Sequence, residues 1–117
     1  MLTDGQSVSI AAGATVNAFL GRPTEFIGIP SVMRLMLAAD AAGVQAQLLI
    51  NVGGTQLAPL AAGSSVNVAS TAGAGPKQDE DIVCDNVAIP AGARLQLNLT
   101  NTGGATTVAR YRAVLAP

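Results

Sequence analysis

The sequence lacks the side chains on which most enzymes depend. It contains no His and no Trp, one Cys and one Tyr, and charged residues make up only 11% of it. General acid–base catalysis needs titratable groups near the working pH, and zinc or iron sites need several His or Cys ligands. We therefore predict that the chain is not an enzyme and holds no metal or cofactor.

The charge balance and the apolar runs argue against two classes of partner. Six basic residues stand against seven acidic ones, whereas nucleic-acid-binding proteins usually carry a basic excess that neutralises phosphates. The longest apolar runs are far shorter than the roughly 20 residues that span a bilayer, and the polar start Met1–Gly5 is unlike a secretory signal. We predict no binding to nucleic acid or membrane, and synthesis in the cytoplasm.

Small and apolar residues dominate the chain instead. Half of the residues are hydrophobic and only 3% are aromatic, so Val, Leu, Ile, Ala and Met must fill the core. A chain of 117 residues is expected to form one domain, residues 1–117. Its mean hydropathy of +0.45 is high for a soluble monomer. We therefore expect partners or further copies of the chain to cover part of its apolar surface.

Glycine-containing pairs divide the chain into short segments. They are Ala12-Gly13, Ala42-Gly43, Gly53-Gly54, Ala62-Gly63, Ala91-Gly92 and Gly103-Gly104. Glycine takes positive φ without a Cβ clash, so each pair predicts a turn, and the two Gly-Gly pairs predict hairpins. Regular turns between short apolar stretches are typical of an antiparallel sandwich or barrel.

Alternation of apolar and polar residues marks the clearest strands. In Arg94–Thr100 three leucines share one face and polar side chains share the other, and Val44–Val52 repeats the pattern. Further strands are predicted at Val8–Ile10, Thr15–Phe19, Glu25–Ile29 and Thr106–Leu115. Together they predict an all-β protein, an antiparallel β-sandwich of about eight strands. Its predicted core residues include Val16, Leu35, Leu37, Leu48, Ile50, Val87, Leu95, Leu97, Leu99 and Tyr111.

The segment Ser31–Ala42 is compatible with two structures. A helix is possible because Ser31 is a suitable N-cap, good helix formers follow it, and Gly43 stands at the C-cap position. As a strand, the segment would lead through Asp40–Gly43 into the next strand as a hairpin and would bury Leu35 and Leu37. The strands predicted on both sides favour the strand.

A long loop is predicted at Ala69–Asp81. It contains Ser, Thr, Ala, Gly and Pro and ends in three consecutive acids, Asp79, Glu80 and Asp81. It is not a domain linker, because Ile82–Leu115 is too short to bury a core of its own. Loops of this length in a compact domain are often functional or ordered by a partner.

Four arginines fall within predicted strands and are the candidate interface residues: Arg34, Arg94, Arg110 and Arg112. Arg110 and Arg112 are two residues apart, so they project from the same face. Guanidinium groups suit bidentate pairing with carboxylates at protein interfaces. Two interpretations stay open, a solvated sheet face and a contact with a subunit or partner.

Three stretches near the C-terminus carry a resemblance to known proteins: Asp85–Leu97, Asn101–Gly104 and a last strand ending in Val114–Pro117. They resemble the small jelly-roll β-sandwich modules of virus particles. Similar closing strands occur in the capsid decoration (cement) proteins of tailed bacteriophages, which sit on the outer shell, often as trimers at local three-fold positions. The likeness covers most of the chain in style.

The resemblance implies a jelly-roll-like fold and a structural role in the virion. The partner would be the major capsid protein, the oligomer a homotrimer, and the location the capsid surface of a particle made in the host cytoplasm. Burial of apolar surface across neighbouring capsid subunits would stabilise the shell, and repeated weak contacts would add avidity. The acidic loop and the N-terminal arm Met1–Ser7 are the segments expected to become ordered on the shell.

Two other functions stay open. One is another structural role in a virion, as a single jelly-roll shell protein or a tail or fibre protein, although no basic N-terminal arm is present to pack a genome. The other is a glycan-binding β-sandwich module. Sugar sites usually rely on stacking aromatics, and the chain offers only Phe19, Phe26 and Tyr111.

Overall fold

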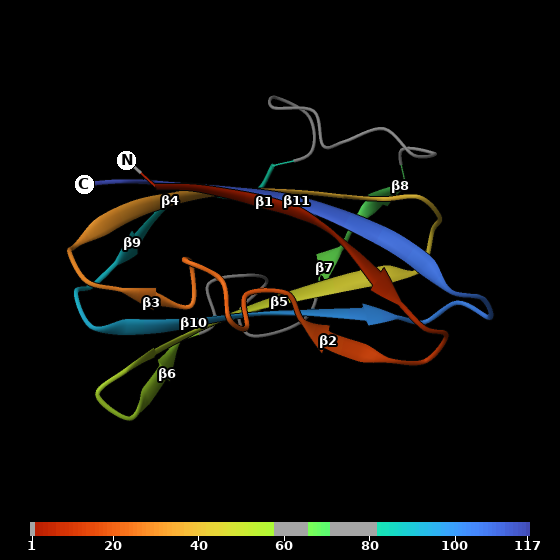
Figure 1. Cartoon of the computed structure of the whole chain (residues 1–117), viewed down its shortest axis with the longest axis horizontal. Coiled ribbons are helices and arrows are strands. Elements are labelled where there is room, and N and C mark those ends of the chain that lie inside the picture. The colour runs from red at the N-terminus through yellow and green to blue at the C-terminus, as the bar shows by residue number, and fades with distance from the viewer. Residues whose placement is uncertain (1, 58–65, 71–81) are drawn as a thin grey trace.

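Two β-sheets packed face to face make up the described part of the computed structural model, which comprises residues 2–57, 66–70 and 82–117. The first sheet has the order β1 (Leu2–Ile10), β11 (Thr107–Ala116), β4 (Ser31–Ala39) and β9 (Ile82–Ile89), and the short β8 (Ala69–Ser70) also pairs with β4. The predicted all-β sandwich is confirmed (Figure 1).

The second sheet is built around two long central strands. They are β10 (Ala93–Asn101) and β5 (Val44–Val52), which pair over eight residues. The short strands β2 (Thr15–Asn17) and β3 (Phe26–Ile27) pair with the other edge of β10. On the far edge of β5 lie β6 (Thr55–Leu57) and β7 (Val66–Asn67).

The order of the strands is that of a jelly roll. If β2 and β3 count as one position and β6 and β7 as another, the sheets read β1-β11-β4-β9 and β2/β3-β10-β5-β6/β7. This arrangement gives eight positions in two sheets, as in a double Greek key. The described pairs are antiparallel except for β4 with β8, which is a parallel pair of two residues.

The predicted turns are present, but two of the predicted hairpins are wrong. Gly53-Gly54 does close a two-residue hairpin between β5 and β6, with φ of 56° and 86°. Asp40–Gly43 and Asn101–Gly104 instead carry the chain from one sheet to the other, and the amide of Thr102 donates to the carbonyl of Gly43 at 2.9 Å. Glycine indicates that the chain turns, but it does not indicate which sheet the next strand joins.

The described Ala-Gly pairs also lie at connections between the two sheets. Gly13, Gly43 and Gly92 have φ of 72°, 101° and 80°, and each stands where the chain passes between the sheets. A side chain is strained at such angles, which explains why glycine occupies these corners. The pair Ala62-Gly63 lies outside the described residues. Residues 71–81 of the predicted long loop lie outside them as well.

Ser31–Ala39 is a strand, so the favoured interpretation of this segment is confirmed. The prediction for the N-terminal arm is wrong for residues 2–7. Leu2 to Ile10 pair along their whole length with β11, from Leu2 opposite Leu115 to Ile10 opposite Thr107. The strand was not predicted because residues 2–7 do not alternate between apolar and polar side chains. One of the buried residues is the charged Asp4, which is 4% exposed and whose partners lie far away in sequence.

The core between the sheets is aliphatic, as predicted. Eight of the ten predicted core residues are at most 2% exposed, while Val16 and Val87 are partly buried and pack against the core. The prediction for β11 is also confirmed, because Thr107, Ala109, Tyr111, Ala113 and Leu115 are all buried. Phe19, Ile10, Met33 and Ile89 are also large, fully buried core residues and were not among the predicted ones.

Candidate interaction surface

The four candidate arginines lie on two opposite faces of the molecule. Arg110 and Arg112 project from the outer face of β11, as predicted, and Arg34 projects from the same face of the neighbouring β4. Arg94 lies on the outer face of the other sheet. The structure therefore brings three of the arginines to one face and separates the fourth.

Arg110 and Arg94 each have a carboxylate partner among the described residues. Arg110 forms an ion pair with Asp40 at the end of β4. The Arg94 guanidinium lies 3.2 Å from the Glu25 carboxylate and 5.5 Å from the centre of the Phe26 ring. Arg112 is exposed and Arg34 half-buried. Surface ion pairs of this kind contribute about 0–1 kcal/mol to stability, so the fold does not depend on the Arg94 and Arg110 pairs.

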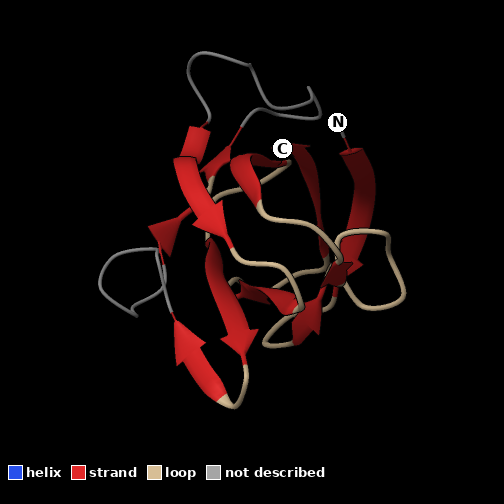
Figure 2. Cartoon of the chain, turned by 90° about the vertical axis from the view of Figure 1, so that its left-hand side faces the viewer, coloured by secondary structure: helices blue, strands red, loops and turns tan. Residues whose placement is uncertain are grey.

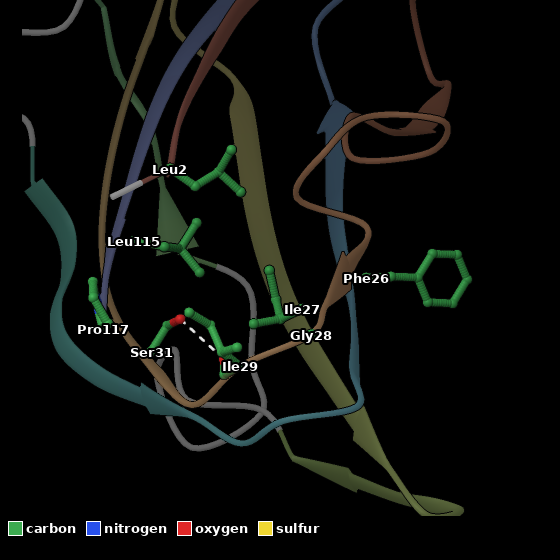
Figure 3. A pocket seen from close by; sticks show the side chains of 8 residues that line it. All are labelled: Leu2, Phe26, Ile27, Gly28, Ile29, Ser31, Leu115 and Pro117. Carbon is green, nitrogen blue, oxygen red and sulfur yellow. Dashed lines mark hydrogen bonds between the residues drawn. The ribbon is translucent and has the colours of Figure 1, made fainter.

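An open pocket of about 260 Å³ lies at the end of the sandwich where β1 starts and β11 ends (Figure 3). Both termini are side by side at this end in Figure 1, and Figure 2 views the molecule from it. We call it the terminal pocket. It is lined by Leu2, Phe26, Ile27, Gly28, Ile29, Ser31, Leu115 and Pro117.

The wall of the pocket opposite the termini is the segment that joins β3 to β4. Ile27 is 5% exposed and pairs with Ala93 of β10, which fixes the start of this wall. The hydroxyl of Ser31 donates to the carbonyl of Ile29 at 3.1 Å and holds the turn before β4. At Gly28 a Cβ would meet nothing within 4 Å, so this part of the wall faces open space.

Exposed apolar side chains also occur in and beside the segment that forms this wall. Among the described residues the exposed large hydrophobic side chains are Leu20, Phe26, Ile29 and Val32, and three of them fall within seven consecutive residues. Phe26 is 65% exposed and Ile29 is 59% exposed. In Figure 3 the Phe26 ring points away from the pocket, towards the side of the molecule. The pocket with the exposed side chains of Phe26 and Ile29 is referred to below as the apolar end.

The chemistry of the apolar end is that of a contact surface. No lining side chain of the terminal pocket titrates, and Ser31 supplies the one polar side chain. Contiguous exposed apolar surface bordered by polar residues is typical of a site that another molecule covers. Phe26 was predicted only as an aromatic residue available for a sugar site, and the surface was not predicted, because alternation within strands does not indicate which loops meet at one end of the sandwich.

A buried carboxylate forms the main polar cluster of the described residues. Asp4 accepts hydrogen bonds from Tyr111 at 2.9 Å and Thr24 at 3.0 Å, and its other oxygen lies 2.5 Å from Arg22. Burial opposes the ionisation of Asp4, but the hydrogen bonds from Arg22, Tyr111 and Thr24 outweigh it and lower the pKa of the carboxyl below its ordinary value of 3.8. Asp4 is therefore ionised at neutral pH.

The same cluster shifts the ionisation of Tyr111. Burial and the neighbouring Asp4 carboxylate raise the pKa of the phenol from 10.0 to about 12. The ring also packs edge-on against Phe19, with the ring centres 5.2 Å apart. Two of the three aromatic residues are thus buried in the core, and only Phe26 is exposed.

We predict that the tyrosinate absorbance near 295 nm appears with a midpoint near pH 12. Tyr111 is the single tyrosine, so its titration can be followed without interference. Because the pKa is higher in the folded state, the phenol stabilises the fold below pH 10, and this stabilisation is lost as the pH rises towards 12. A midpoint near pH 10 while the protein is still folded would contradict the buried Asp4 contact.

Two further observations concern the described residues alone. Within residues 2–57, 66–70 and 82–117, no group of three or more His, Cys, Asp or Glu side chains could hold a metal ion. The same part of the chain contains no helix of the length and apolar character that a membrane span requires.

No protein-family model matches the chain, and no curated protein sequence is significantly similar to it.

Proposed function

We propose that the chain is a structural protein of a virus particle, a decoration (cement) protein that binds the outer surface of the capsid. Its partner is the major capsid protein, and its apolar end is the surface that makes the contact. The observation that carries the proposal is an open apolar pocket at one end of a jelly-roll module, whose wall segment carries the exposed side chains of Phe26 and Ile29.

The physical basis of the proposal is burial of apolar surface. Full burial of a side chain such as Ile or Phe contributes about 1.5–3 kcal/mol, and both Phe26 and Ile29 are more than half exposed in the isolated chain. Each contact is modest by itself. Copies held side by side on a shell bind with a high effective concentration, which converts modest contacts into stable attachment.

We also propose that the chain acts as a homotrimer, the oligomer that the resemblance implies. The outer face of the first sheet, with Arg34, Arg110 and Arg112, supplies polar and charged groups for the contact between subunits. Light scattering of the purified chain tests this directly. A trimer has about three times the 11.6 kDa mass of one chain, and a mass of one chain contradicts it.

Replacement of both Arg110 and Arg112 by Ala is expected to weaken trimer formation and leave the fold of each subunit intact. Both side chains lie on the outer face, and the Arg110 pair with Asp40 is partly exposed. The measurement is the trimer dissociation midpoint on dilution, with far-UV circular dichroism as a check of folding. Arg94→Ala on the opposite sheet is the matched control and should leave the midpoint unchanged; an unchanged midpoint in the double variant shows that the two arginines are solvated surface.

The glycan-binding alternative lacks accessible aromatic rings on which a sugar could stack. Phe19 is 0% exposed and Tyr111 2% exposed, so neither ring is accessible to a sugar. Phe26 is accessible, but the Arg94 guanidinium lies over its ring. A single aromatic ring with one face occupied is a poor stacking platform.

Co-sedimentation tests the proposed function. Purified chain is mixed with empty capsids of the virus that encodes it, pelleted, and quantified in the pellet. The proposal predicts saturable binding to the outer surface, with a fixed number of copies per capsid. Absence of the chain from the pellet at micromolar concentration contradicts it, and binding to glycan-coated beads but not to capsids favours the glycan-binding alternative.

A further inference from the structure

The connection between β2 and β3, residues Ala18–Glu25, crosses the open side of the sandwich and is called the strap below. Both of its ends are tied to β10. The amide of Ala18 donates to the carbonyl of Leu97 at 2.8 Å, and the amide of Leu95 donates to the carbonyl of Glu25 at 2.8 Å. Between these ends Phe19 enters the core and packs on Tyr111.

The middle of the strap is joined to the first sheet through one carboxylate. Arg22 and Thr24 both donate to Asp4 of β1, and Tyr111 of β11 donates to the same group. Other hydrogen bonds of Leu20 to Thr24 stay within the strap, such as that from the Arg22 amide to the Phe19 carbonyl at 3.0 Å, or reach Asn17 at the end of β2. The first residue of the strap has its own links to this sheet, because Gln6 and Tyr111 donate to the Ala18 carbonyl. Asp4 is the group that joins the middle of the strap to β1 and β11.

The remaining charged groups near the strap are engaged elsewhere. Glu25 binds Arg94 and accepts a hydrogen bond from the amide of Gly21. Arg110 and Arg112 lie on the opposite face of β11 from Tyr111. From the strap and β11 the polar groups that face Asp4 are therefore Arg22, Thr24 and Tyr111, and β10 presents it with no charged group.

We propose that the strap is an acid-released device: protonation of Asp4 frees Leu20–Thr24 from the first sheet while the two sheets remain folded. A neutral carboxylic acid loses its ion pair with Arg22 and much of its capacity to accept charge-assisted hydrogen bonds. The Arg22 side chain is already 36% exposed, so water can solvate the freed guanidinium. The proposal does not depend on which partner the chain binds.

The sheets can survive this release because their pairing does not involve the strap. β1 and β11 form nine residue pairs, and β10 and β5 form eight. The folded-state pKa of Asp4 lies below that of the unfolded chain, so the carboxylate stabilises the fold above pH 3.8 and this stabilisation is lost as the pH falls further. Release of the strap is therefore expected below pH 3.8.

Tyrosine fluorescence of the wild-type protein gives the first test. Tyr111 is the single tyrosine and there is no tryptophan, so the emission reports on this cluster alone. A carboxylate that accepts the phenol hydrogen quenches emission, so protonation of Asp4, the step that releases the strap, should raise it. On acid titration the rise is expected at higher pH than the loss of the β-sheet signal in circular dichroism; a single coincident transition overturns the proposal.

Hydrogen exchange of an Asp4→Asn variant at neutral pH gives the second test. The amides of Leu20, Arg22 and Glu25 should exchange roughly tenfold faster or more than in the wild type, while amides of β5 and β10 keep their protection. Asp40→Asn is the matched control, because it removes a carboxylate that pairs with an arginine outside the strap. Unchanged exchange of the strap amides in a folded Asp4→Asn protein overturns the proposal.

A third variant separates release from unfolding if Asp4→Asn does not fold. Thr24→Val removes one strap donor and leaves Asp4 ionised between Arg22 and Tyr111. The fluorescence rise is then expected at higher pH than in the wild type, because one hydrogen bond that favours the carboxylate is lost. A midpoint equal to that of the wild type contradicts the role of Asp4 in holding the strap.

Discussion

Leu97→Asp is expected to leave the chain unfolded at room temperature. Leu97 is 0% exposed, stands in the middle of β10, and lies opposite Leu48 of β5. A carboxylate at this position would enter an aliphatic layer without a partner, which costs several kcal/mol. The buried Leu contact is lost as well, worth about 1.5–3 kcal/mol. Together these approach the total stability of a small domain, about 5–15 kcal/mol.

Thermal unfolding followed by circular dichroism measures the effect. Asn98→Asp is the matched control, because it adds the same charge one residue later, where the side chain is half-buried on the other face of the strand. The control should retain a cooperative transition. An unchanged melting temperature for Leu97→Asp would show that the register of β10 is wrong.

The double variant Phe26→Ser and Ile29→Ser is expected to lose capsid binding and keep its fold. These side chains are 65% and 59% exposed, so the isolated chain loses little on their removal. If the capsid covers them, the affinity of one site should fall by roughly a hundredfold, given the apolar surface that would no longer be buried. The measurement is the dissociation constant for empty capsids, with the melting temperature as a check of folding.

Leu20→Ser provides the control for that prediction. Leu20 is 63% exposed, as much as Phe26, but it does not line the terminal pocket. Its replacement should leave the affinity for capsids nearly unchanged. If all three replacements weaken binding equally, general surface hydrophobicity and not the apolar end accounts for attachment.

Much of the fold could be predicted from the sequence because the core is aliphatic and the strands alternate strictly. The bounds predicted for Val44–Val52 coincide with β5, and the three leucines of β10 are all fully buried. In such strands the burial of every second side chain fixes the face that points inward. This local signal does not depend on which strands are neighbours.

The pairing of the strands could not be predicted in the same way. A strand buries the same face whether it joins the first sheet or the second, so Asp40–Gly43 looked like a hairpin although it joins the two sheets. The polar start of β1 was missed because Asp4 is buried by virtue of Arg22, Thr24 and Tyr111. Two of these partners lie about 20 residues away and the third lies more than 100 residues away, beyond any local pattern.

The candidate surface was predicted only in part. The arginines were found because charged side chains interrupt apolar strands, but sequence spacing could not show that Arg94 faces away from Arg34, Arg110 and Arg112. The apolar end is formed by the first strand, the last strand and a loop between them. Such a surface exists only after the chain has folded.

The most direct measurement is the heat-capacity change when the chain binds empty capsids, obtained from calorimetric titrations at several temperatures. Burial of apolar surface gives a negative heat-capacity change. We predict a clearly negative value that the Phe26→Ser and Ile29→Ser replacements bring close to zero. Absence of binding heat at every temperature, or binding with a heat-capacity change near zero that salt abolishes, would contradict attachment through the apolar end.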